Sequence, residues 1–290
     1  MAKREIDFLV DPWGVLLGMW RRYKGTADGK PKPSEQRIRM WQQAMLYKYV
    51  DWKLDRIIEE NPGEPEPLGV RASRQIEDEQ WEELLSTANT LCKKFPSNVS
   101  GFRHACWALR RLKRLDEAEE VAKRTMRRFP LSYVGWEAYA NCATDRGDFV
   151  QAERRWFDMR EHFPEKAFSH TMHALALVKL GDIAAADDIL GAATENFPDN
   201  NTLRREYAIS AERMDDWGEA AERWLVGRSM FEREAIFHVR SALALLRLQD
   251  YETAEEVISG AEFIFPTNAD VTAVRRRLEA VRGKANSAQG

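Results

Sequence analysis

A Phe-Pro pair returns at a fixed interval along this chain, and this period restricts the possible folds more than any other feature. The prolines of the pair stand at Pro96, Pro130, Pro164, Pro198 and Pro266, so the same interval occurs three times in succession and is then doubled. The double interval contains Phe231 followed by Glu232, so the Phe is kept where the Pro is lost. A period of about 20–50 residues is typical of supersecondary units stacked side by side.

Each period predicts two antiparallel helices joined by a tight turn. Small residues return 12 and 24 positions before each proline site, which indicates that two backbones approach closely there. The second helix has a candidate N-cap in most units, at Asp148, Asp182, Asp216 and Asp250. Proline blocks the end of that helix, and the next helix can be capped by Ser97, Ser132, Asn200 and Asn268.

The Phe of each pair is predicted to be the last apolar contact of the second helix, buried against the following unit. Where Glu232 replaces the proline, we expect the helix to lack a firm end and the array to bend or loosen.

This pattern resembles the tetratricopeptide repeat family. The two small-residue columns, the Phe-Pro terminus and the 34-residue spacing carry the resemblance, and the third unit matches best, with Trp136, Tyr139, Ala140, Ala152 and Pro164. The resemblance covers about residues 79–268. It implies an all-α fold, an α-solenoid of stacked antiparallel helix pairs, whose concave groove is lined by the first helix of each unit and binds a peptide or a partner helix.

The chain outside the repeats predicts four further parts. Residues 1–33 are predicted to form a short amphipathic segment and a linker. Residues 34–78 are predicted to form a capping helix (34–61) and a second linker. This linker is placed at residues 61–75, because Pro65, Pro67 and Gly69 disfavour a helix. Residues 269–283 are predicted to form a C-terminal capping helix, and residues 284–290 a disordered tail.

The second unit carries the main candidate for a partner-binding site. Arg103, Trp107, Arg110 and Arg114 follow one another at spacings of 4, 3 and 4, which places them on one helical face, and Arg111 lies beside them. Residues 99–130 contain nine basic and four acidic side chains. This face is suited to an acidic peptide, a carboxylate or a phosphate. The alternative is a solvated basic face with Trp107 packed between units.

Further candidates follow on the first helices of later units. Glu137, Asn141 and Asp145 again share a face, and the resemblance implies that an amide at the place of Asn141 bonds the backbone of a bound peptide. Beyond them the predicted surface becomes apolar, and we expect some of its members to be core and others to form a trough for a partner helix: Phe168, Leu175, Val178, Ile209, Ile236, Val239, Leu243 and Leu246.

Other functions have little support in the sequence. The net charge of −3 argues against nucleic-acid binding. His170 and His173 are spaced to share a metal, but no third ligand is evident, so no metal is predicted. No cofactor is predicted, because phosphate-binding loops and nucleophile motifs are absent from the sequence, and no enzyme activity is expected. Three cysteines without metal-site spacing fit a reducing compartment and a cytoplasmic protein.

The sequence therefore favours a non-catalytic scaffold or adaptor that holds a protein or peptide partner. The alternative is a self-assembling or membrane-associated structural protein that uses its Trp-rich N-terminal segment. Residues 8–24 are the only candidate membrane contact, with Trp13 and Trp20 followed by basic residues, although the same segment could dock on the next helix instead. Oligomeric state is left open by these patterns.

Overall fold

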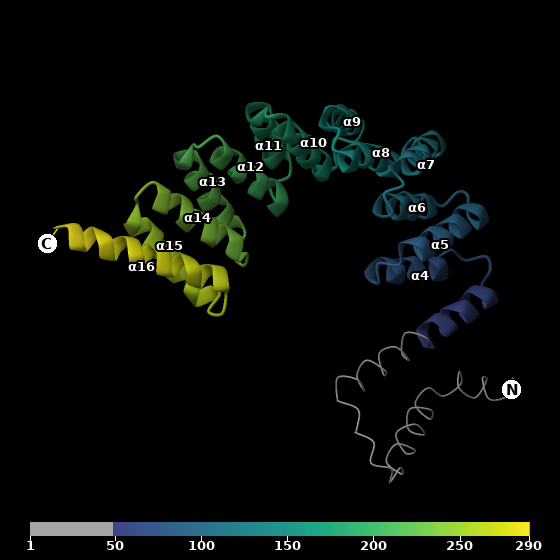
Figure 1. Ribbon diagram of the computed structural model, residues 1–290, viewed down its shortest axis with the longest axis horizontal. Helices are drawn as coiled ribbons and strands as arrows, with labels where there is room; N and C mark the ends of the chain where they lie inside the picture. Colours follow the sequence, from purple (N-terminus) through teal and green to yellow (C-terminus); the bar gives the residue numbers. More distant parts are fainter. Residues whose placement is uncertain (1–48, 290) are drawn as a thin grey trace, which may run out of the picture. The chain divides into compact units, whose positions relative to one another are not determined.

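The computed structural model describes residues 49–289, with side chains up to residue 283, and every regular element in that part of the chain is a helix (Figure 1). The chain forms two compact units, one ending at Arg114 and one starting at Leu115. The described helices of unit 1 are residues 49–60, α4 (Glu66–Glu77), α5 (Trp81–Lys94) and α6 (Val99–Arg111). The all-α repeat architecture predicted from the constant Phe-Pro interval is confirmed.

Unit 1 corrects the predicted linker over residues 61–75. α4 begins at Glu66, and both Pro65 and Pro67 lie at its start, where the backbone amides have no partner within the helix. Proline is therefore tolerated there, although it would break a helix interior. Pro67, Leu68 and Ala72 are buried, so α4 packs as a helix of unit 1 and residues 66–77 are not a linker. Of the helix predicted over residues 34–61, residues 49–60 are helical and the preceding ones lie outside the described residues, as does the segment 1–33.

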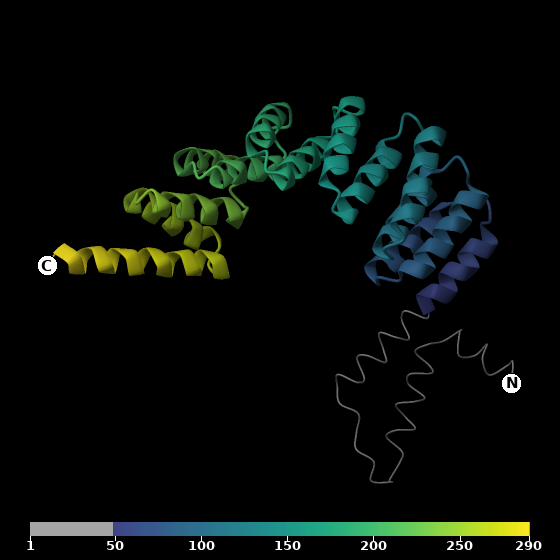
Figure 2. The same cartoon turned by 45° about the horizontal axis from the view of Figure 1, so that its top comes forward.

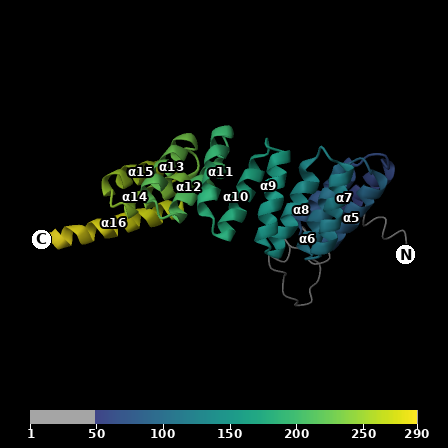
Figure 3. The ribbon, with the colours of Figure 1, turned by 90° about the horizontal axis from the view of Figure 1, so that it is seen from above.

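Unit 2 is a stack of helices that follow one another in sequence order, with neighbours packed side by side (Figures 2 and 3). Its helices are α7 (Leu115–Arg128), α8 (Tyr133–Arg146), α9 (Phe149–His162), α10 (Ala167–Leu180), α11 (Ile183–Asn196), α12 (Asn201–Arg213), α13 (Trp217–Met230), α14 (Ala235–Arg247), α15 (Tyr251–Ile264) and α16 (Ala269–Gln289).

α16 corrects the predicted C-terminal boundary. The helix starts at Ala269 as predicted but continues to Gln289, so the predicted tail over residues 284–290 is helical to that point. The segment contains no proline, and its Ala and Gln residues favour a helix, which lets α16 continue past Gly283.

The predicted helix caps are present in most units. Asp148, Asp182, Asp216 and Asp250 each accept a hydrogen bond from the backbone amide three residues later. Gly147 and Gly181 end α8 and α10 in the left-handed conformation, with φ of 76° and 88°. Ser132, Asn200 and Asn268 also cap as predicted. At the start of α6 the cap is Asn98 rather than Ser97, because Asn98 is the residue adjacent to the first helical turn.

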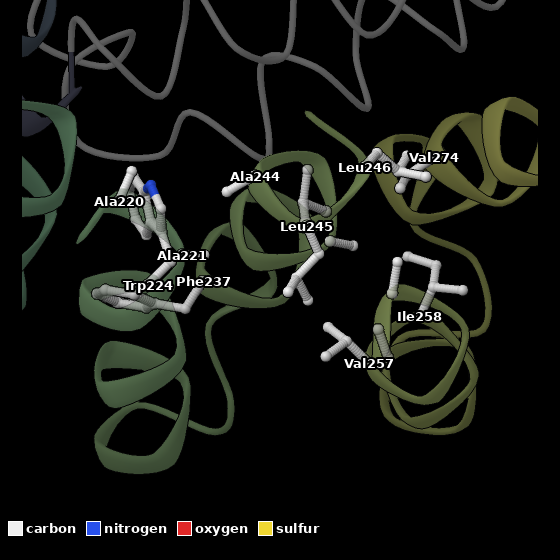
Figure 4. Packing of buried hydrophobic residues seen from close by; sticks show 14 of the residues in the cluster. Ala220, Ala221, Trp224, Phe237, Ala244, Leu245, Leu246, Val257, Ile258 and Val274 are labelled. Carbon is white, nitrogen blue, oxygen red and sulfur yellow. The ribbon is translucent and has the colours of Figure 1, made fainter. Parts of the chain in front are cut away.

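The two small-residue columns are buried among the packed helices. All twelve of their residues are buried, from Ala72 and Leu84 in unit 1 to Ala242 and Ala254 in unit 2. Figure 4 shows how larger side chains fill the remaining space at the C-terminal end, where Trp224 faces Phe237 and Leu245 lies between α13 and α15. The buried core of unit 2 is divided into clusters that each join neighbouring helices, on α8–α10, α10–α12 and α12–α16.

The Phe column differs from its prediction. Phe163 is buried, but the other five phenylalanines are only half-buried. The rings of Phe163, Phe197 and Phe265 contact aromatic residues on the first helix of their own repeat, while Phe231 contacts Phe237 of the following one. In five repeats the Phe is the first residue after the second helix, and its φ lies between −124° and −135°. These residues are Phe95, Phe163, Phe197, Phe231 and Phe265. The column therefore mostly closes its own helix pair.

The loss of proline at Glu232 does not remove the helix end. α13 stops at Met230, and Phe231 has φ −124° and ψ 56°, close to the values of Phe95 before its proline. The Nε2 of His238 lies 2.9 Å from the carbonyl oxygen of Glu232 and fixes the turn. The expectation of a helix without a firm end at this junction is wrong, because α13 ends at the same position of the repeat, and with similar backbone angles, as the helices that precede a proline.

Candidate partner-binding surfaces

α6 presents the predicted basic face because its other side is packed tightly on α5. The Asn98 side chain starts the helix by accepting a hydrogen bond from the Ser100 amide at 2.9 Å. A Cβ on Gly101 would lie 2.8 Å from the Leu91 side chain, so the close approach of α6 to α5 requires glycine at this position. The packed side consists of Gly101, Phe102, Ala105, Cys106, Ala108 and Leu109.

Trp107 lies on the opposite, exposed side of α6. Its side chain is 42% exposed, between the exposed Arg103 and the half-buried Arg110. Because these three residues are spaced by 4 and 3 positions within one regular helix, they share a face. We call Arg103, Trp107 and Arg110 the α6 face.

Arg114 is not part of the α6 face, contrary to the predicted spacing. α6 ends at Arg111, and Lys113 has a left-handed φ of 61°, so the chain turns before it reaches Arg114. The spacing of 4 residues from Arg110 to Arg114 therefore does not place Arg114 on the same face, because the helix ends between them.

Arg111 and Arg114 link α6 to α5. The guanidinium of Arg111 lies 4.8 Å from the centre of the Trp81 ring and 3.7 Å from Glu79, and Arg114 lies 3.8 Å from Glu82. All these charged side chains are largely exposed, so each pair contributes only a few tenths of a kcal/mol, about 0.2–1. These two arginines contribute mainly to the packing of neighbouring repeats.

His104 lies between the α6 face and the core. Burial lowers its pKa, and the positive charge of Arg103 lowers the pKa further. Its Nδ1 is buried without a hydrogen-bond partner in the described part of the chain. The imidazole is therefore neutral at neutral pH, and the positive charge of this region comes from the arginines.

The second set of candidates lies on α8 in unit 2. Glu137 and Asn141 are half-buried, and Asp145 is exposed near the end of the helix. A Cβ on Gly135 would lie 2.6 Å from the Met126 amide nitrogen, so α8 also packs closely on the helix before it. α6 and α8 belong to different units, and the structure shows each set only within its own unit.

The apolar candidates do not form an open trough. Among the eight residues predicted for it, Val239 and Leu246 are buried and the other six are half-buried. Val239 and Leu246 belong to the core cluster of α12–α16, and Ile236 and Leu243 pack against it. The half-buried members contribute to core packing while part of each surface stays accessible to a partner.

The two histidines considered as metal ligands have separate partners. The Nε2 of His170 lies 3.0 Å from the Pro164 carbonyl oxygen, and the Nε2 of His173 lies 2.9 Å from Glu153. Among the described residues, three or more metal-ligating side chains never gather closely enough to hold a metal ion. No helix within residues 49–289 is both long and apolar enough to span a membrane.

Sequence reasoning missed two arginines in unit 2 whose side chains are largely buried. Arg155 and Arg223 are each about 10% exposed, and each stacks on a tyrosine, Tyr139 or Tyr207. The signal was present in the sequence at twice the repeat period, because both the arginines and the tyrosines return after two repeats.

A family model for the tetratricopeptide repeat matches residues 106–162, 171–225 and 208–269, which is more than half of the chain. Yeast Tom70 has a similar fold, with a TM-score of 0.59 and 14% identity over 76% of this chain and 45% of that one. Pseudomonas aeruginosa pilF has a TM-score of 0.53 and 10% identity over 73% of this chain and 96% of that one. The APC/C hetero-tetramer Cut9-Hcn1 has a TM-score of 0.50 and 16% identity over 76% of this chain and 44% of that one.

The chain thus spans less than half of the matched chains of Tom70 and Cut9-Hcn1. At these identities the likeness to solved structures establishes the fold alone. No curated protein matches the sequence.

Proposed function

Because the chain belongs to the tetratricopeptide repeat family, whose fold is in general that of a protein-interaction scaffold, we propose that it is a non-catalytic adaptor. In this proposal the α6 face of unit 1 anchors an acidic segment of a partner protein. The arginines recognise carboxylates, and Trp107 covers the apolar part of the segment.

The exposure of Trp107 is the observation that carries this proposal. The equivalent position on the first helices of later repeats is occupied by Asn141, Leu175, Ile209 and Leu243, and all four are half-buried. Trp107 is larger than any of them and is 42% exposed. A large, accessible aromatic residue between arginines is the composition favoured at the centre of protein interfaces.

The charge around Trp107 favours an acidic partner. α6 carries Arg103, Arg110 and Arg111 and has no acidic residue between Val99 and Arg111. Basic side chains at the last turn also face the negative end of the helix dipole, which holds them in place. A partner segment with Asp or Glu next to an apolar side chain complements this arrangement.

Two binding measurements on the full chain test the proposal. The first is affinity capture from host extract, with quantification of the bound proteins. The second is fluorescence anisotropy with a labelled Glu-rich peptide that contains one Leu-Leu pair. The test variant is Arg103→Ala with Trp107→Ala and Arg110→Ala, and the matched control is Arg154→Ala with Phe157→Ala, because Phe157 is also 42% exposed.

We expect the triple variant to lose at least 10-fold in peptide affinity and to lose the captured partner, since the interface anchors are removed. The control variant should change affinity less than about 2-fold. Circular dichroism melts monitor the fold, and Trp107→Phe provides a milder change at the same position. Unchanged capture and peptide affinity in the triple variant would show that the α6 face is not the partner site.

A further inference from the structure

A largely buried arginine, Arg155, helps to close the junction between α7 and α8, where Arg146 of α8 also pairs with Glu119 and Asp116 of α7. Arg155 reaches from α9 and lies 3.7 Å above the Tyr139 ring of α8. Its Nη1 donates to the Tyr139 carbonyl oxygen at 2.9 Å, and its two Nη atoms donate to the Glu119 carboxylate of α7 at 3.2 and 3.3 Å. One side chain therefore joins three helices from two successive repeats.

The junction between α11 and α12 has the same arrangement two repeats later. Arg223 lies 3.6 Å above the Tyr207 ring and donates to the Tyr207 carbonyl oxygen at 2.8 Å. It also binds both carboxylate oxygens of Asp187 on α11, and Ser210 donates to the same carboxylate. Counted along the repeats, Asp187, Tyr207 and Arg223 occupy the positions of Glu119, Tyr139 and Arg155. We call these two the polar junctions.

The intervening junctions lack this arrangement. Ile189 and Val257 stand where the polar junctions have arginine, one repeat after Arg155 and Arg223 respectively. The acid and tyrosine positions are occupied by Glu153 and His173 between α9 and α10, and by Ala221 and Ser241 between α13 and α14. Ser241 bonds a carbonyl of its own helix, so it makes no polar link across the junction.

Aromatic side chains take the main part in closing these junctions, beside the pair of His173 Nε2 and Glu153 that links α10 to α9 at 2.9 Å. Trp156 of α9 contacts Phe168 of α10 edge-on, with 6.2 Å between ring centres. Trp224 of α13 contacts Phe237 of α14 in the same way, with 5.6 Å between ring centres. Figure 4 shows the two side chains next to each other. Both tryptophans are fully buried, whereas the polar junctions have Ala122 and Leu190 at the same position. We call α9–α10 and α13–α14 the aromatic junctions.

We infer that unit 2 is built from two modules of two repeats each, residues 133–200 and 201–268, and that it flexes at the polar junction α11–α12 between them. Each module contains two helix pairs joined by an aromatic junction. The turn at the middle of each module is also held alike, by the Nε2 of His170 or His238 and a backbone carbonyl six residues earlier. In unit 2, the aromatic junctions therefore stay closed and the polar junction α11–α12 between them opens.

The physical reason lies in what each junction exposes when it opens. Separating Trp224 from Phe237 transfers a large apolar surface to water, and this cost is not recovered. Separating Arg223 from Asp187 breaks a strong contact, but both charges regain the hydration that they lost on burial. Opening α11–α12 also exposes the buried Leu190 and Leu203, but these aliphatic side chains carry less apolar surface than Trp224 with Phe237, so we expect a smaller opening free energy at the polar junction.

Distances between spin labels measure this flexing in the full chain. Arg154, Asp188, Glu222 and Glu256 are exposed and occupy the same position on α9, α11, α13 and α15. Labels at 188 and 222 span the polar junction, and the pairs 154/188 and 222/256 span the two aromatic junctions. The three native cysteines are replaced by alanine in all samples, and melts confirm that each labelled protein is folded.

We expect the 188/222 distance distribution to be at least about twice as broad as the other two, because only this pair crosses the joint that opens. Arg223→Met should broaden 188/222 further and leave 222/256 unchanged. Arg213→Met is the matched control, since Arg213 pairs with Glu206 on the same helix. Equal widths for all three pairs, or a broader distribution across an aromatic junction, would overturn the inference.

Discussion

The junctions α11–α12 and α13–α14 connect equivalent helices of the same array, yet they are closed by different chemistry. At α11–α12, Arg223 joins Asp187 and Tyr207. At α13–α14, Trp224 packs on Phe237 and the position of the arginine's carboxylate partner is held by Ala221. The helices return with every repeat, whereas the side-chain pattern at the junctions returns with every second repeat. The comparison shows that one fold period can contain a longer period in the side chains that join the repeats.

The largest effect is expected at the aromatic junction. Trp224→Ala should lower the free energy of unfolding by about 3–5 kcal/mol, because it empties a fully buried site and leaves Glu212 without its indole hydrogen bond. Urea denaturation of the full chain measures this change. Trp224→Phe keeps most of the buried ring and should cost clearly less. A cost below about 1 kcal/mol for the alanine variant would remove the distinction between the junctions.

A smaller loss is expected at the polar junction. Arg223→Met should cost about 2–4 kcal/mol, because Asp187 then stays buried with only Ser210 to bond it. Arg213→Met removes the same charge from a pair on one helix and should cost less than about 0.5 kcal/mol. The same urea experiment compares them. Similar costs for the two variants would mean that the buried arginine does not hold the junction.

The other polar junction should respond to acid. Burial alone would raise the pKa of Glu119, but hydrogen bonds from Arg146, Lys123 and Arg155 outweigh it and lower the pKa from 4.5 to about 2. A carboxylate with a lowered pKa stabilises the folded state above pH 4.5, and this contribution is lost as the pH falls towards 2.

We expect about 1–2 kcal/mol of stability to disappear over that range, after allowance for solvent screening. Denaturation at a series of pH values in wild type and Glu119→Gln isolates this contribution. The variant should show a weaker dependence between pH 4.5 and pH 2 than wild type. Parallel curves for the two proteins would count against a stabilising role for the Glu119 carboxylate.

The smallest effect is expected at a turn that belongs to neither type of junction. Gln249 adopts a left-handed φ of 62° between α14 and α15, at the position where Gly147 and Gly181 stand in other repeats. Gln249→Gly should stabilise the protein by about 0.5–1 kcal/mol, because glycine adopts this conformation without strain. Gly181→Ala is the reverse control and should destabilise by a similar amount. Thermal melts of both variants give the sign, and a destabilising Gln249→Gly would show that the turn is unstrained.

The features that depend on neighbouring residues could be predicted from the sequence. Asp148 and its equivalents cap their helices as predicted because capping needs only the next three residues. α4 could not be predicted by counting helix breakers, because the effect of Pro65 and Pro67 depends on whether they fall in the first turn. Arg114 was misplaced since extrapolated spacing does not show where a helix ends.

The features that depend on packing between repeats were harder to predict. Sequence columns that compare every repeat mix the polar junctions with the aromatic ones. In such columns Arg155 and Arg223 stand beside Ile189 and Val257, so the arginine pattern was not recognised. The burial of the Phe column also depends on which helix each ring meets, and only Phe163 is buried. The α6 face was predicted as a set of side chains, but the exposure of Trp107 required the fold of unit 1.

Native-state hydrogen exchange of the full chain tests the difference between the junctions most directly. The account predicts that amides of α11 and α12 exchange through a partial opening with a smaller free energy than amides of α13 and α14. Arg223→Met should lower the opening free energy at α11–α12 alone. If the four helices exchange with the same opening free energy, and Arg223→Met lowers all of them equally, then unit 2 opens as a single body and the two-module account is wrong.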